Sequence, residues 1–75
     1  MSMLTIMPFT PEVRYAELSY AQKRAIREKL TESFDGHDGR YLDSDVSDHS
    51  IGQEVGVGWS LIRYVRERDY GHLAP

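Results

Sequence analysis

Apolar residues recur at helical spacing in the first half of the chain, downstream of an irregular start. The apolar positions of this run lie four residues apart and therefore share one helical face: Ile26, Leu30 and Phe34. Ser19, followed three residues later by Gln22, has the pattern of a capping box, in which each residue satisfies a free backbone donor of the other. We therefore predict a helix over residues 19–34.

The second half of the chain predicts two shorter helices separated by glycine. Ser47 suits the N-cap of a helix over 48–55, and Gly56 ends that helix because glycine adopts the left-handed conformation without steric cost. A third helix is expected from Gly58 or Trp59 to about Tyr70, with Gly71 as its C-cap candidate.

The N-terminal part of the sequence shows no sustained period. Residues 1–18 are expected to form an N-terminal arm with at most one helical turn, which Thr10 would cap and Pro11 would begin. The apolar run at 1–7 is interpreted as a tail or a short edge strand. It has no basic flank and is far shorter than the roughly 20 apolar residues of a spanning helix, so neither a leader nor a membrane segment is expected.

A turn-rich segment separates the first predicted helix from the second. Two glycines and two aspartates between Asp35 and Gly39 predict a loop over 35–46, in which Tyr41 and Leu42 anchor to the core. The expected fold is therefore all-α. It is a small three-helix bundle over residues 19–75 with an irregular N-terminal segment.

The segment Asp48–Glu67 resembles the core of the helix-turn-helix DNA-binding proteins of bacteria and phages. That family has apolar residues at places four, eight, ten, fifteen and eighteen, a small residue at place five and usually glycine at place nine. Counted from Asp48, these seven places hold, in chain order, Ile51, Gly52, Val55, Gly56, Val57, Ile62 and Val65. The pattern suits two short helices that cross closely over a glycine turn.

The resemblance implies that the second helix of the motif enters the major groove of DNA with its N-terminal half facing the bases. Arg63 is the candidate for base reading, because its guanidinium can donate two hydrogen bonds to guanine. Ser60 and Tyr64 are candidates for bonds to phosphate or bases. Phosphate contacts that set register without reading sequence are assigned to Arg66, Arg68 and the basic residues of the helix over 19–34.

Trp59 departs from this picture, because an indole at the entrance of a reading helix is large and has only one hydrogen-bond donor. Three interpretations stay open. The ring stacks on a sugar or a thymine methyl group, it folds back over the helix at 19–34 as core, or it forms a protein-binding patch with Leu61 and Tyr64.

The charge pattern adds a second hypothesis. The chain has 75 residues, enough for one domain, and a net charge of −3, which argues against a bulk electrostatic binder of nucleic acid. Residues 35–54 contain six acidic side chains and one basic side chain. The alternative to a small transcriptional regulator is therefore a phage-type inhibitor or adaptor that binds a host protein, such as an enzyme or a defence complex. A single domain of this charge should bind DNA weakly, so we also expect a homodimer that reads two half-sites.

Chemistry beyond binding has little support in the sequence. The chain has no cysteine, which favours a cytoplasmic location and excludes a thiolate metal site. Asp43, Asp45, Ser47 and Glu54 follow calcium-loop spacing, but Asp48 occupies the place of the required glycine. No catalytic motif is present, so we expect no enzyme activity, no cofactor and no metal.

Overall fold

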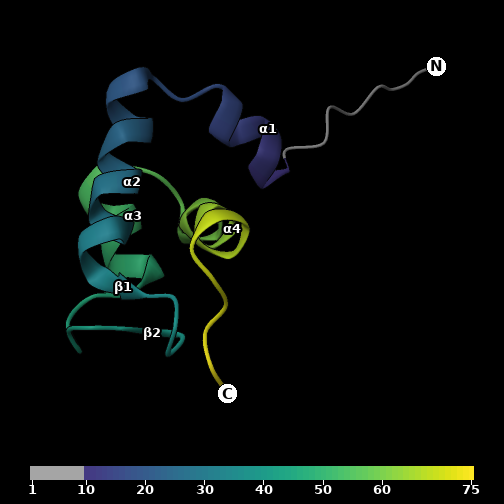
Figure 1. Ribbon diagram of the computed structural model, residues 1–75. Coiled ribbons are helices and arrows are strands. Elements are labelled where there is room, and N and C mark those ends of the chain that lie inside the picture. Colours follow the sequence, from purple (N-terminus) through teal and green to yellow (C-terminus); the bar gives the residue numbers. More distant parts are fainter. Residues whose placement is uncertain (1–9) are drawn as a thin grey trace.

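The computed structural model describes residues 10–75, which form four helices and a short antiparallel hairpin (Figure 1). In chain order these are α1 (Pro11–Ala16), α2 (Tyr20–Ser33), β1 (Phe34–Asp35), β2 (Arg40–Tyr41), α3 (Asp48–Val55) and α4 (Trp59–Asp69). No helix in this part of the chain has the length and apolar character needed to cross a membrane.

Helix α2 starts after Ser19 as its sequence predicts, but it ends at Ser33, because Phe34 already belongs to strand β1. The Ser19 hydroxyl accepts from the Gln22 backbone N–H at 3.1 Å, and the Gln22 side chain accepts from the Ser19 N–H at 3.3 Å. The predicted capping box is therefore confirmed. Ile26 and Leu30 are fully buried, and Phe34 follows them into the core at the start of the hairpin.

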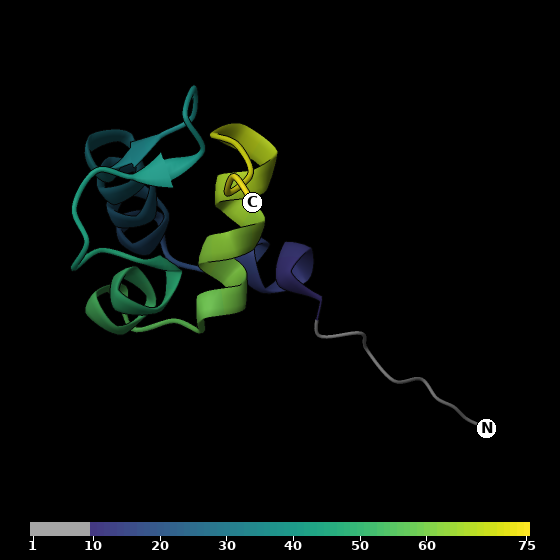
Figure 2. The same ribbon diagram turned by 90° about the horizontal axis from the view of Figure 1, so that it is seen from below.

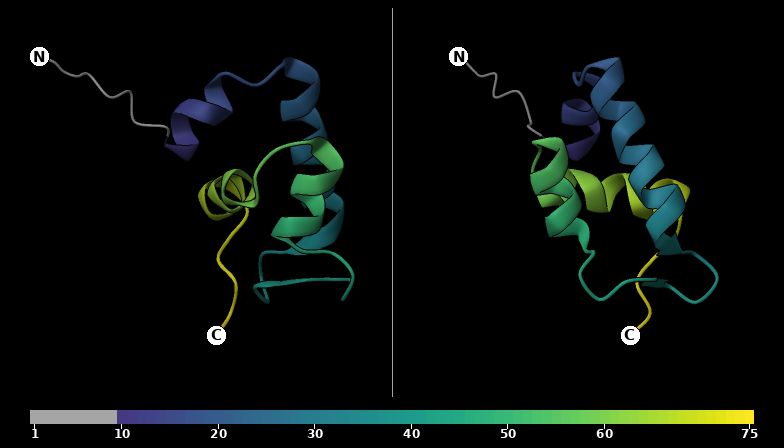
Figure 3. Two further views of the ribbon diagram at one scale, coloured as in Figure 1. Left: turned by 180° about the vertical axis from the view of Figure 1, so that it is seen from behind. Right: turned by 90° about the vertical axis from the view of Figure 1, so that its left-hand side faces the viewer.

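One apolar core joins α2, α3, α4 and the start of the hairpin. Its buried members are Ile26, Leu30, Phe34, Ile51, Leu61, Ile62 and Val65. Helices α2 and α3 run side by side, and α4 crosses them, so that Figure 1 looks nearly along the α4 axis (Figures 1 and 3). The crossing gives α4 one buried face and leaves the opposite face open.

The sharp bend predicted between the last two helices is confirmed. Gly56 has φ 88°, and its N–H donates to the Gly52 carbonyl at 2.8 Å. A Cβ on Gly52 would lie 2.8 Å from the Val57 carbonyl oxygen, so the close approach of the two helices requires glycine there. Of the predicted apolar places, Ile51, Ile62 and Val65 are buried, and Val55 and Val57 pack half-buried against the core.

The hairpin corrects the all-α prediction. Phe34, predicted as the end of the first helix, pairs with Tyr41, and within the segment predicted as a loop Asp35 pairs with Arg40. The Asp35 carboxylate accepts backbone N–H groups of His37 and Asp38 at 2.9 and 3.1 Å, which tightens the turn that brings the strands together. Tyr41 is anchored as expected, but Leu42 is 64% exposed and its predicted role in the core is wrong.

Helix α1 also changes the predicted organisation. Thr10 caps it and Pro11 begins it, as the sequence suggests. However, α1 packs against α4, with the rings of Tyr15 and Tyr64 6.4 Å apart. This part of the predicted arm therefore belongs to the packed body and adds a fourth helix to the three expected. The tail or edge strand predicted at 1–7 lies outside the described residues.

The C-terminal segment closes against the hairpin, as the view from below shows (Figure 2). The Ala74 N–H donates to the Gly39 carbonyl at 2.8 Å. A Cβ on Gly39 would lie 2.8 Å from the His72 carbonyl oxygen, and a Cβ on Gly36 would collide with the Tyr70 carbonyl. The two glycines of the hairpin turn therefore make room for the residues that follow α4.

Replacing Gly52 with alanine tests the close crossing of α3 and α4. We expect Gly52→Ala to lower the free energy of unfolding by about 1–3 kcal/mol, because the new methyl group must displace the Val57 backbone. Gln53→Ala, at the next and exposed position of α3, is the matched control and should change stability little. Urea denaturation followed by circular dichroism measures both, and an unchanged Gly52→Ala would contradict the close approach.

Candidate nucleic-acid interface

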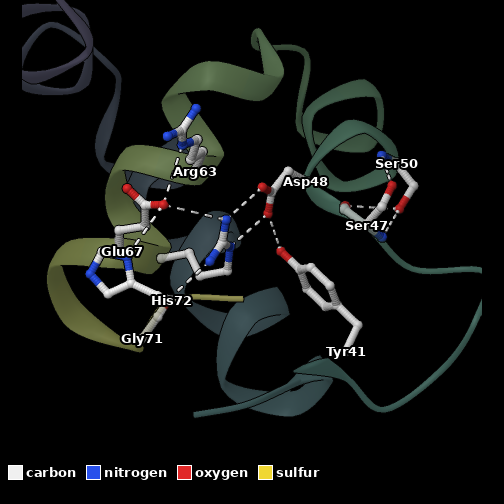
Figure 4. Close-up of polar contacts among 9 residues, drawn as sticks. Tyr41, Ser47, Asp48, Ser50, Arg63, Glu67, Gly71 and His72 are labelled. Atoms are coloured by element: carbon white, nitrogen blue, oxygen red, sulfur yellow. Dashed lines mark hydrogen bonds and ion pairs between the residues drawn. The ribbon is translucent and has the colours of Figure 1, made fainter. Parts of the chain in front are cut away.

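A buried ion pair joins the start of α3 to the end of α4. Arg66 is 1% exposed and forms two hydrogen bonds of 2.9 Å to the Asp48 carboxylate, one from Nε and one from a terminal nitrogen. Its other terminal nitrogen donates to the Gly71 carbonyl at 2.9 Å. The Tyr41 hydroxyl of β2 donates to the same carboxylate (Figure 4). Four segments of the chain therefore meet at one carboxylate and one guanidinium.

The protonation states of this cluster follow from burial and from Asp48. Burial disfavours the charged guanidinium of Arg66, but the hydrogen bonds and charge of Asp48 outweigh it and raise the pKa of Arg66. Burial, together with the hydrogen bond to Asp48, also raises the pKa of the Tyr41 hydroxyl well above its usual value. At neutral pH the cluster therefore holds a charged guanidinium and a protonated phenol.

This position corrects the sequence-based role of Arg66. A side chain that is buried and bound to Asp48 cannot reach a phosphate, so Arg66 is not a phosphate contact. The sequence carries a signal for its burial, because Arg66 lies four residues after Ile62 and therefore on the same inner face of α4. Its partner is 18 residues away along the chain, and helical spacing cannot reveal such a pair.

The open face of α4 contains most of the residues predicted to read DNA. Trp59, Ser60 and Arg63 are exposed, and Tyr64 is half-buried against α1. The Arg63 side chain is 55% exposed and pairs with Glu67 one turn later at 3.3 Å. Figure 4 shows Glu67 between Arg63 and His72, whose Nδ1 lies 3.5 Å from the carboxylate. Arg63, the cation predicted to read the bases, is therefore partly neutralised.

Trp59 does not fold back over α2, so the interpretation of this residue as core is wrong. The side chain is 43% exposed, and its ring stacks on His49 of α3 with centroids 4.9 Å apart and an angle of 21° between the planes. Leu61 points the other way and is buried. It is therefore not part of an exposed patch with Trp59 and Tyr64.

Arg68 lies at the junction of α1, α2 and α4. It binds Asp69 at 2.7 Å and the Tyr64 hydroxyl at 3.1 Å, and Arg27 of α2 binds the same Asp69 at 2.8 Å. The hydrogen bonds from Arg68 and then Arg27 lower the pKa of Asp69 to about 2. Arg68 therefore contributes to the packing of the helices, although 44% of its side chain is exposed to solvent.

The wider surface has mixed charge. Six of the nine basic side chains form ion pairs with carboxylates: Arg24, Arg27, Lys29, Arg63, Arg66 and Arg68. The others, Arg14, Lys23 and Arg40, have no ion pair within residues 10–75. Arg14 of α1 lines a hollow that Gly58 and Ser60 also line, next to the start of α4. An unpaired cation therefore flanks the open face.

No group of three or more His, Asp or Glu side chains in residues 10–75 is arranged to hold a metal ion. Comparisons with protein-family models, with curated proteins and with solved structures found no significant match to this chain.

Breaking the buried pair should destabilise the fold strongly. We expect Asp48→Asn or Arg66→Met to cost about 3–5 kcal/mol of unfolding free energy, because each leaves an uncompensated buried partner. The double variant Asp48→Asn with Arg66→Met should lose less than the sum of the single losses. Denaturant titration measures the coupling, and Asp45→Asn, at an exposed position before α3, is the control. Additive losses would show that the two side chains act independently.

The raised pKa of Tyr41 predicts a loss of stability at alkaline pH. The fold favours the protonated phenol, so this contribution is fully present below the ordinary tyrosine pKa of about 10 and declines as the pH rises above it. Tyr41→Phe should remove that part of the alkaline decline. Free energies of unfolding measured from neutral pH to about pH 11 test this, and an equal decline in both proteins would contradict it.

Proposed function

We propose that the protein is a small transcriptional regulator that binds duplex DNA sequence-specifically, with the N-terminal half of α4 in the major groove. The observation that carries the proposal is the open face of α4, directly after the Gly56 bend, where Trp59, Ser60 and Arg63 project away from the core. In DNA-binding helix-turn-helix units, the second helix presents its N-terminal residues to the base edges in this way.

Arg63 is the side chain to which we assign base recognition. Its pairing with Glu67 occurs at the surface, where an ion pair contributes little, so a guanine edge can replace the carboxylate. Glu67 itself places a negative charge on the face that meets DNA. It therefore weakens DNA binding, and it limits Arg63 to DNA sites whose base edge accepts its hydrogen bonds better than the Glu67 carboxylate does.

Arg14 takes over the role of phosphate contact that was predicted for Arg66. It lies beside the start of α4 and forms no ion pair within residues 10–75, although Glu17 lines the same hollow. Arg68 is a second phosphate contact at the other flank of the face. With so few cations, one copy binds weakly, and we propose that two copies bind two half-sites about one helical turn of DNA apart.

Selection of binding sites from a pool of random duplexes tests this function, followed by anisotropy titrations on the enriched site. We expect Arg63→Ala to lower affinity about tenfold or more and to relax the choice of one base pair. Arg14→Ala should weaken binding to all sequences alike. It should also reduce the slope of log affinity against log salt concentration by about one. Arg40→Ala, on the hairpin, is the matched control. A pool without enrichment would contradict the proposal.

Glu67→Gln gives a result of opposite sign. Removing this charge should raise DNA affinity severalfold, because it frees Arg63 and reduces repulsion of the phosphates. The same titrations measure the change, with Glu32→Gln on the exposed side of α2 as the control. Unchanged or weaker binding would show that this face of α4 does not meet DNA.

The paired charges favour a second candidate function, which is binding of a host protein through the same face. An exposed tryptophan beside a near-neutral helix surface is typical of a protein-binding hot spot. This candidate predicts no enriched duplex. It also predicts that the protein captures a partner even after nuclease treatment. Trp59→Ala should abolish this capture, whereas Arg14→Ala should leave it unchanged.

A further inference from the structure

The indole of Trp59 is an exposed apolar surface at the start of α4. Its ring lies nearly parallel to the His49 imidazole, at 4.9 Å between centroids. The two residues come from the first turns of α4 and α3, so the stack bridges the helices that the Gly56 bend joins. One ring face is therefore held in place, while 43% of the residue stays accessible.

The chemistry of this platform restricts what it can recognise in a major groove. An indole offers an apolar surface and one N–H donor, with no acceptor. Among the groups that base pairs present there, the C5-methyl group of a pyrimidine is apolar, whereas the others are hydrogen-bond donors or acceptors. A flat apolar surface that replaces water around a methyl group gains free energy, and the same surface against a bare C5–H gains less.

The position of Trp59 relative to Arg63 sets a register. The two residues are four positions apart on α4, which corresponds to about 6 Å along a helix. Successive base pairs are about 3.4 Å apart. With α4 in the groove, contacts from the two side chains therefore fall one or two base pairs apart.

We propose that the Trp59–His49 stack recognises the C5-methyl group of a pyrimidine, one or two base pairs from the guanine that Arg63 contacts. The inference rests on the proposed function and adds a specificity determinant to it. His49 is a positioning residue, because it holds the indole flat and does not itself need to contact the base. Thymine and 5-methylcytosine both carry the methyl group that this stack contacts.

The experiment starts from the duplex enriched in the selection described above. Each thymine in turn is replaced by uracil, which removes only the methyl group, and affinity is measured by anisotropy. At one thymine near the guanine, we expect the wild-type protein to bind the uracil duplex about fourfold more weakly, as befits loss of one buried methyl group. In Trp59→Ala this ratio should fall to about one. In His49→Ala it should fall part of the way, and Arg40→Ala should keep it.

The outcomes separate this inference from the function on which it rests. An enriched site whose thymines all tolerate uracil, or a ratio that persists in Trp59→Ala, would overturn the methyl contact and leave DNA binding intact. Absence of any enriched site would overturn the proposed function itself. Cytosine and 5-methylcytosine at the same position distinguish the source of the methyl group. A gain on methylation shows that either pyrimidine serves, and a thymine–uracil difference without such a gain restricts the contact to thymine.

Discussion

The whole arrangement depends on the buried pair of Asp48 and Arg66. Removing two charges from water is costly, and the cost is offset only when the geometry and the remaining hydrogen bonds are satisfied. Here the carboxylate receives two bonds from Arg66 and one from Tyr41, and Arg66 also reaches the Gly71 carbonyl. The pair fixes how α4 crosses α3. It thereby fixes which face of α4 stays open, and the proposed base contacts of Trp59 and Arg63 are on that face.

The parts of the fold that could be predicted from the sequence are those set by local rules. Ser19 with Gln22, and Ser47, start α2 and α3 because side-chain caps act within three residues. Gly56 ends α3 because the bend needs a positive φ. Helical spacing placed Ile51 and Ile62 in the core, and the structure buries both.

The features that the sequence did not reveal depend on contacts between distant segments. The two-residue strands of the hairpin are too short to show alternation of apolar and polar residues. The turn residues of this segment therefore predict only a loop. The prediction that Arg66 is a surface cation is wrong because arginine is seldom buried unless paired, and the partner of Arg66 lies 18 residues earlier. The packing of α1 depends on Tyr15 meeting Tyr64 from the other end of the chain. Net charge likewise did not show that most basic side chains are paired.

The closure of the C-terminal segment has a consequence for how the protein is made. Asp48 and the apolar side chains of α2 and α3 precede Arg66, Gly71 and Ala74 in the chain. Without those later residues the Asp48 carboxylate lacks its arginine partner, and Ile26, Leu30 and Ile51 lack the α4 residues that cover them. The described body therefore closes only after the residues up to Ala74 are available to fold, and the chain relies on its own solubility, or on a chaperone, up to that moment.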